Sequence, residues 1–136
     1  MEQITMLDEQ QKEKIIIVED MCENYCTEVR KLYSPLFLRG KLSLIVDLTR
    51  SIRGKTAAKD QLFDDGYESY IEIGTEDDDG YYPHAYIPIW KCKSEMFHKT
   101  GYFTKDIKGI KIKLKSMMTE IAEDLELQHE EGKTNE

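Results

Sequence analysis

The chain has 136 residues and a formal charge of −8, with 40% apolar and 34% charged residues. A chain of this length fits one domain, which can bury about two-thirds of its unfolded surface without disulfides or metals. The acidic excess disfavours general attraction to nucleic acid or to anionic membranes, and the odd count of three cysteines disfavours a disulfide framework. No stretch approaches the roughly 18 apolar residues of a membrane span, and the first residues lack the pattern of a secretion signal, so we expect a cytoplasmic protein.

The first strong pattern along the chain is an amphipathic helix. Residues 1–7 are predicted to be a flexible end, and Asp8 is a suitable N-cap residue. Apolar side chains then recur at steps of three and four, as on a helix seam that meets a partner; they are Ile15, Val18, Cys22, Tyr25, Val29 and Leu32. Pro35 is predicted to end this helix, because the residue before a proline is disfavoured in the helical conformation.

Residues 36–53 fit two kinds of secondary structure. Their apolar residues follow the spacing of a helix face at Leu38, Leu42, Ile45, Leu48 and Ile52. The residues between 42 and 48 also alternate as they would in a strand. We favour a middle helix, because the apolar run continues past the usual length of a strand.

The composition changes in the middle of the chain, where β-branched and aromatic residues alternate with polar ones. Residues 67–73 show the alternation of a strand, and the acidic segment 75–80 is typical of a turn. Residues 81–92 form a second extended segment, in which Pro83 and Pro88 predict an edge strand or a bulged strand. We therefore expect a β-hairpin here.

A second helical pattern lies near the end of the chain. It predicts a helix from about 105 to 128, with Thr104 as its cap, because apolar side chains follow the three-four spacing at Ile107, Ile110, Leu114, Met117 and Ile121. Residues 105–115 also alternate as in a strand, and Gly109 weakens a helix by about 1 kcal/mol. Residues 130–136 are predicted to be disordered.

Together these elements predict an α+β fold in a single domain, residues 8–129. We expect long N- and C-terminal helices packed with a middle helix and a small antiparallel β-hairpin or sheet, and we expect the two terminal helices to sandwich the sheet. The apolar stripe of a helix can pack against another part of its own chain or against a second copy of the chain. A homodimer through the first helix is therefore a further expectation.

Two segments carry part of a ligand-binding signature. Gly54, Lys55 and Thr56 match the end of a phosphate-binding loop, but Thr49 occupies the position of its first glycine. Segment 75–86 matches part of a calcium loop, but Tyr86 occupies the position of the bidentate carboxylate that closes the loop around the ion. Neither a nucleotide nor calcium is therefore predicted.

The cysteines and histidines form no metal or catalytic signature. Zinc ligands are available at Cys22, Cys26, His84, Cys92 and His98, but their spacing is not that of a zinc ribbon or knuckle. Cys92 with either histidine would be a nucleophile and a base, yet no glycine run that could form an oxyanion hole lies near it. We therefore predict no catalytic residue, no metal and no cofactor. A small enzyme of unknown class remains as a third hypothesis, after the two binding functions described below.

The charges occur in blocks of alternating sign. Residues 63–90 carry eight acidic and no basic side chains, residues 36–62 carry six basic and two acidic ones, and residues 91–115 carry eight basic and two acidic ones. Blocks of opposite sign can attract one another within the fold. Alternatively, the acidic block presents a negative face to a basic partner.

Aromatic residues accompany this acidic block. They either pack in the core or offer rigid contact surfaces to a partner. The leading hypothesis is a non-catalytic acidic interaction protein, an inhibitor or accessory factor, that binds a basic or nucleic-acid-binding protein. The candidate partner-binding residues are Tyr67, Tyr70, Glu72, Glu76, Asp77, Asp78, Asp79, Tyr81, Tyr82, Tyr86 and Trp90.

The alternative hypothesis is nucleic-acid binding through the basic segments 36–62 and 91–115. The candidate residues in the first segment are Arg39, Lys41, Arg50, Arg53, Lys55 and Lys59. Those in the second segment are Lys105, Lys108, Lys111 and Lys115.

Overall fold

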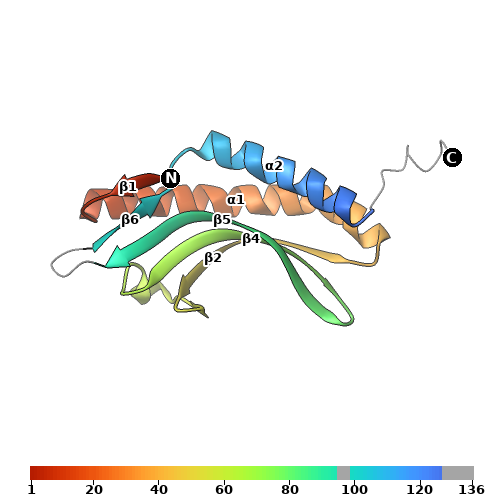
Figure 1. The fold of residues 1–136 in the computed structure, drawn as a ribbon, viewed down its shortest axis with the longest axis horizontal. Coiled ribbons are helices and arrows are strands. Elements are labelled where there is room, and N and C mark those ends of the chain that lie inside the picture. The colour runs from red at the N-terminus through yellow and green to blue at the C-terminus, as the bar shows by residue number, and fades with distance from the viewer. Residues whose placement is uncertain (95–98, 127–136) are drawn as a thin grey trace.

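The computed structural model describes residues 1–94 and 99–126 as two layers, a six-stranded antiparallel sheet with two helices on one of its faces (Figure 1). The elements in chain order are β1 (Glu2–Ile4), α1 (Glu9–Arg39), β2 (Ser43–Ile52), β3 (Lys55–Thr56), a short 3-10 helix (Lys59–Gln61), β4 (Tyr67–Asp77), β5 (Gly80–Ser94), β6 (Lys99–Phe103) and α2 (Ile107–Asp124). The strands lie in the order β1-β6-β5-β4-β2-β3. The sheet curves, and its hollow face points away from both helices (Figure 1).

The predicted architecture is wrong in its middle part. Residues 36–39 complete α1, and the segment predicted as a middle helix forms β2, which pairs with β4 along its whole length from Ser43 to Ile52. Leu44 and Val46 are buried while Asp47 is exposed, so the alternation of a strand describes this segment. The two terminal helices do not sandwich the sheet, because both lie on the same face (Figure 1).

Helix α1 begins where the sequence predicts and ends later. The Asp8 carboxylate caps it by accepting a hydrogen bond from the Gln11 backbone N–H at 2.8 Å. The predicted stop at Pro35 is wrong, because α1 continues to Arg39. A proline inside a helix costs about 3 kcal/mol, and burial of Leu36 and Phe37 just after it contributes about 1.5–3 kcal/mol for each side chain.

The seam of α1 is largely the predicted one, but it packs within the chain. Ile15, Cys22, Tyr25 and Val29 are buried, whereas Leu32 is 68% exposed because the buried stripe moves to residues 36 and 37. A helix of 3.6 residues per turn drifts away from a strict seven-residue repeat, which accounts for this shift. The buried seam is therefore not available for the predicted homodimer.

Both ends of the described chain differ from the prediction. Residues 2–4, expected in a flexible end, form β1, in which Gln3 pairs with Tyr102 of β6. Helix α2 is capped by Asp106 rather than Thr104, since Asp106 Oδ1 accepts a hydrogen bond from the Gly109 backbone N–H at 3.1 Å. The prediction that this helix reaches residue 128 is wrong, because α2 ends at Asp124 with Leu125 as its C-cap. The tail predicted at 130–136 lies outside the described residues.

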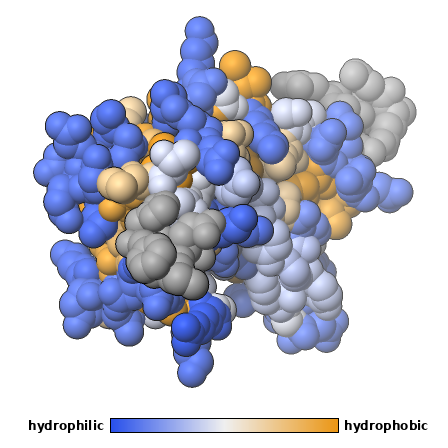
Figure 2. All heavy atoms as spheres, turned by 60° about the vertical axis from the view of Figure 1, so that its left-hand side comes forward, coloured by the Kyte–Doolittle hydropathy of each residue, from blue (hydrophilic) through white to orange (hydrophobic). Residues whose placement is uncertain are grey.

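The core lies between the helices and the sheet. Its largest fully buried side chains include Trp90, Tyr67, Phe37 and Phe103. Trp90 packs over Gly101 of β6 so closely that a Cβ atom there would lie 2.6 Å from Trp90 Cη2, which is why a glycine occupies this position. Hydrophilic side chains cover most of the end of the molecule where α1 begins (Figure 2).

One carboxylate is buried inside this core. Glu19 of α1 is 0% exposed, and its Oε1 accepts a hydrogen bond from Arg50 Nε of β2 at 3.0 Å. Its Oε2 accepts a hydrogen bond from the Tyr67 hydroxyl of β4 at 2.8 Å. Burial and the charge of Glu19 raise the pKa of Tyr67 well above its usual value of 10.0. The network joins the long helix to two central strands.

The Glu19 network predicts a large loss of stability when the carboxylate is removed. We expect Glu19→Ala to lower the free energy of unfolding by about 3–5 kcal/mol, because Arg50 loses its buried partner and the Tyr67 hydroxyl loses its acceptor. Urea unfolding followed by circular dichroism measures this loss. Glu28→Ala, at an exposed position on the same helix, is the control and should change stability by less than about 0.5 kcal/mol. Equal effects of the two substitutions would contradict the role of the network.

The raised pKa of Tyr67 predicts how stability depends on alkaline pH. The contribution of the Tyr67 hydroxyl to the free energy of unfolding is fully present below its pKa in the unfolded chain, which is about 10. This contribution is lost as pH rises toward the higher pKa of the folded protein, because the unfolded chain releases the proton first. Tyr67→Phe should therefore be less stable than the original protein at pH 8. Above pH 10 its free energy of unfolding should fall less steeply with pH, and the two slopes should differ by about 1.4 kcal/mol per pH unit. Urea unfolding at a series of pH values tests this, and identical slopes for both proteins would contradict it.

Candidate functional site

The face of the sheet opposite the helices carries tyrosines and carboxylates. Along β4, the side chains of Tyr67, Ser69, Ile71 and Ile73 are buried toward the helices, so the alternating residues project from the other face. Strand register places residues of β2, β5 and β6 beside them. We call this surface the outer face; it consists of Thr49, Glu68, Tyr70, Glu72, Tyr81, Tyr86, Pro88, Lys91 and Tyr102.

Glu72 organises the centre of the outer face. Its Oε2 accepts a hydrogen bond from the Tyr81 hydroxyl, and its Oε1 accepts one from Thr49 Oγ1 at 3.3 Å. The Tyr81 ring lies over Gly74, where a Cβ atom would be 2.4 Å from Tyr81 Cε1. Burial, and then the hydrogen bond and charge of Glu72, raise the pKa of Tyr81 above its usual value of 10.0. These contacts hold Tyr81 in one position.

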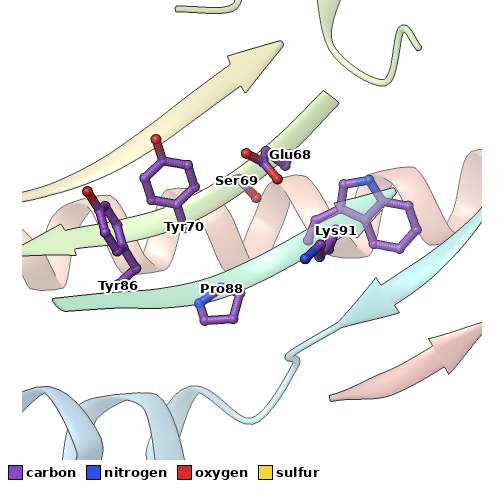
Figure 3. Close-up of a pocket in the computed structure, with 7 residues that line it drawn as sticks. Glu68, Ser69, Tyr70, Tyr86, Pro88 and Lys91 are labelled. Carbon is purple, nitrogen blue, oxygen red and sulfur yellow. The ribbon is translucent and has the colours of Figure 1, made fainter. Parts of the chain in front are cut away.

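A hollow of about 340 Å³ lies next to this centre, between β4 and β5 (Figure 3). The rings of Tyr70 and Tyr86 stand side by side along it, 5.4 Å apart and at 81° to each other. The strand register shifts here, because Tyr70 pairs with Pro88 while its neighbour Ser69 pairs with Trp90. One extra residue in β5 therefore forms a bulge beside the hollow, as Pro88 predicts.

The tip of the β4–β5 hairpin concentrates negative charge. Glu76, Asp77, Asp78 and Asp79 occupy it, and Asp77 Oδ1 accepts hydrogen bonds from the backbone N–H groups of Asp79 at 2.8 Å and Gly80 at 3.2 Å. Within residues 1–94 and 99–126, none of these four carboxylates forms an ion pair. The hairpin end points away from both helices (Figure 1). The tip is a tight turn, not a calcium loop.

The structure divides the predicted partner-binding residues between the core and the surface. Tyr67 and Trp90 are both 0% exposed, so these two residues belong to the core, although Trp90 also borders the hollow. Tyr70, Glu72 and Asp77 are half-buried. The exposed residues of the predicted set are Glu76, Asp78, Asp79, Tyr81, Tyr82 and Tyr86.

Sequence reasoning missed several residues of the outer face. Glu68 and Lys91 face each other across β4 and β5, and Pro88 and Tyr102 lie beside them. The alternation along residues 67–73 already places Glu68 on the same face as Tyr70. The bulge in β5 could not be located from the alternation, so Lys91 could not be assigned to a face.

The predicted basic surface in segment 36–62 is divided by the fold. Arg39 and Lys41 lie where β2 begins, whereas Arg53, Lys55 and Lys59 follow its end, and a strand of ten residues spans about 33 Å. Arg50 is held by Glu19, by Asp20 at 3.0 Å and by Glu23 at 3.5 Å. Arg53 and Gly54 form the turn between β2 and β3, and Lys55 and Thr56 form β3, so this segment does not curl around a phosphate.

The second basic segment lies on and before α2. Lys105 pairs with Glu2 of β1 at 2.8 Å, and Lys111 Nζ lies 5.0 Å from the centre of the Tyr25 ring. Lys108 and Lys115 are exposed on the same helix. This helix lies on the opposite side of the sheet from the outer face (Figure 1).

The cysteine and histidine residues considered as zinc ligands lie in different parts of the fold, with Cys22 and Cys26 on α1 and His84 and Cys92 on β5. Burial raises the pKa of the Cys22 and Cys26 thiols to about 12, which makes both unreactive. Cys92 is half-buried on β5, and His84 Nε2 lies 2.9 Å from Thr75 Oγ1. His98 lies outside the described residues. No cluster of His, Cys, Asp and Glu suited to a metal ion occurs in residues 1–94 and 99–126.

These environments predict different thiol reactivities. We expect Cys92 to react with an aromatic disulfide reagent at pH 8 at least about tenfold faster than Cys22 and Cys26, because the buried thiols rarely ionise. Absorbance of the released thiolate, with the Cys92→Ser variant as the control, measures the rates. Rapid modification of that variant in the folded protein would contradict the burial of the two helix thiols.

Comparison with known proteins gives no assignment. No protein family model, characterised protein or solved structure matches the chain. In the part of the chain that the structure describes, no helix is long and apolar enough to cross a membrane. The functional conclusion therefore depends on the geometry of the outer face.

Proposed function

We propose that this protein is a non-catalytic interaction protein that binds a basic surface of another protein through the outer face and the acidic hairpin tip. The observation that carries the proposal is that exposed tyrosines and unpaired carboxylates lie together on the side of the sheet that no described helix covers. An inhibitor or accessory factor of a nucleic-acid-binding protein fits this role, because the carboxylates can take the place of phosphates.

The outer face has the composition of a protein-binding surface. Tyr81, Tyr86 and Tyr102 are 37%, 51% and 39% exposed. Tyrosine gives a large contact area at a low cost in conformational entropy, because it has few rotatable bonds. Strand pairing on both sides of β4 and β5 and the hydrogen bonds of Glu72 fix the tyrosine positions before a partner binds.

Electrostatics favour a basic partner for the same surface. Residues 63–90 carry eight carboxylates and no basic side chain. Of these carboxylates, only Asp65 forms an ion pair within the described part of the chain, with Lys99 at 3.6 Å. The fold therefore leaves the negative field of this block largely uncompensated. Such a field raises the association rate of an oppositely charged surface.

Nucleic-acid binding is the second candidate, and the lysines of α2 favour it. Lys108, Lys111 and Lys115 are exposed on one helix, which is a usual arrangement for contacts to phosphates. The predicted basic segment 36–62 does not join them in one surface, because its residues lie at the two ends of β2. An enzyme is the third candidate, and we assign no catalytic residue or cofactor. We place the protein in the cytoplasm, where unpaired cysteines such as Cys22, Cys26 and Cys92 persist.

Neutralising the hairpin tip should slow association with the partner. The partner is first isolated by affinity capture from the cells that produce the protein, and association is then measured by biolayer interferometry at several salt concentrations. We expect Glu76→Gln/Asp78→Asn/Asp79→Asn to lower the association rate constant about tenfold at low salt and to weaken its salt dependence. Asp77 is left unchanged because it caps the turn.

The control removes the same charge from exposed positions on the helices, as Glu13→Gln/Glu28→Gln/Glu120→Gln. An equal effect of both triple variants would show that net charge, not the hairpin, governs association and would contradict the proposal. Retention of DNA or RNA on filters at low salt, lost in Lys108→Gln/Lys111→Gln/Lys115→Gln, would support the second candidate instead.

A further inference from the structure

The hollow beside Tyr70 and Tyr86 is a concave part of the outer face with aromatic walls. Its volume of about 340 Å³ is enough for one long side chain. The rings of Tyr70 and Tyr86 and the ring of Pro88 form its apolar sides, and Glu68 and Lys91 lie at one end (Figure 3). Tyr86 is 51% exposed, so part of its ring surface is free for contact.

We propose that this hollow receives a single arginine side chain of the basic partner, with the guanidinium group stacked on Tyr70 and paired with Glu68, and with the aliphatic stem packed along Tyr86. This inference rests on the proposed function and names the contact that anchors the partner. Attraction of a basic partner by negative charge alone would require no hollow in the surface. Insertion of one side chain explains why an aromatic hollow lies within the acidic surface.

The charges around the hollow favour a cation. Glu68 and Glu72 lie on β4 beside Tyr70, and Lys91 is the basic residue that lines the hollow. Glu68 and Lys91 are neighbours across the two strands, but no ion pair joins them in the described structure, so the Glu68 carboxylate remains available. Burial, and then the charges of Glu72 and Glu68, raise the pKa of Tyr70 above its usual value of 10.0.

The shape of the hollow favours arginine over lysine or an aromatic side chain. A guanidinium group is planar, so it can stack on a tyrosine ring while its N–H groups donate to a carboxylate. Its aliphatic stem can pack along Pro88 and Tyr86. A lysine ammonium group holds its water more strongly, and an aromatic side chain would leave Glu68 without a partner.

Titration with small probes tests the hollow without the natural partner. N-acetyl-arginine amide is added to the ¹⁵N-labelled protein, and the neutral isostere N-acetyl-citrulline amide serves as the control. We expect shifts of the backbone amides of Ser69, Tyr70, Tyr86 and Lys91 with the arginine probe, and at least about fivefold weaker binding of the citrulline probe. Equal binding of the two probes, tighter binding of N-acetyl-tyrosine amide, or shifts confined to other surfaces would overturn the inference.

Matched variants assign the contact to Tyr86 and Glu68. Tyr86→Phe keeps the ring and should bind the arginine probe within about twofold of the original protein, whereas Tyr86→Ala and Glu68→Gln should weaken binding about fivefold or more. Tyr82→Ala, another exposed tyrosine that does not line the hollow, should have no effect. Loss of binding in Tyr82→Ala, or full binding in Tyr86→Ala, would overturn the inference.

Measurements with the captured partner separate this inference from the proposed function. If both are right, Tyr86→Ala should increase the dissociation constant about 30-fold, as for an anchor residue, and the hairpin-tip variant should slow association. If the hairpin-tip variant slows association but Tyr86→Ala leaves affinity unchanged, the proposed function stands and the arginine contact is wrong. If neither substitution affects the partner, both are wrong.

Discussion

The buried carboxylate of Glu19 fixes how the long helix sits on the sheet. A charge inside the core is compatible with folding only when its hydrogen-bonding partners are in place, and Arg50 of β2 and Tyr67 of β4 supply them. Only one rotation of α1 about its axis brings Glu19 to both strands. That rotation buries the apolar seam of α1 against the sheet, so the face of the sheet opposite the outer face packs against the helices. The opposite face is left to carry polar and aromatic side chains.

The separation of the two faces explains why most carboxylates of residues 63–90 form no ion pair within the described part of the chain. Basic residues that could compensate it are used elsewhere: Arg50 contacts three carboxylates of α1, and Arg30 pairs with Asp47. The carboxylates of the hairpin tip stay free of ion pairs within the described residues. A surface that is both rigid and uncompensated favours a fast and specific encounter with a basic protein.

Local patterns in the sequence predict some elements and leave others open. The Asp8 cap, the seam of α1 and the alternation of β4 are local features, and each is sufficient to locate its element. Segment 43–52 carries both periodicities, and pairing with β4, whose partner residues lie between 15 (Ile52 with Tyr67) and 33 (Ser43 with Glu76) positions further along the chain, decides between them. The contact of Glu19 with Arg50 joins residues 31 positions apart, so no local pattern indicates it. For the same reason, sequence alone could not tell that Tyr67 is buried while Tyr86 is exposed.

Hydroxyl-radical footprinting of the protein with its captured partner tests the central claim most directly, because it reports which side chains the partner covers. Tyrosine and methionine are readily oxidised, and the molecule offers exposed examples on both sides. The account predicts that oxidation of Tyr81 and Tyr86 falls on binding, while oxidation of Met21 on the exposed side of α1 does not change. Protection of Met21 with unchanged oxidation of both tyrosines would show that the partner binds the helical side, which would contradict the account.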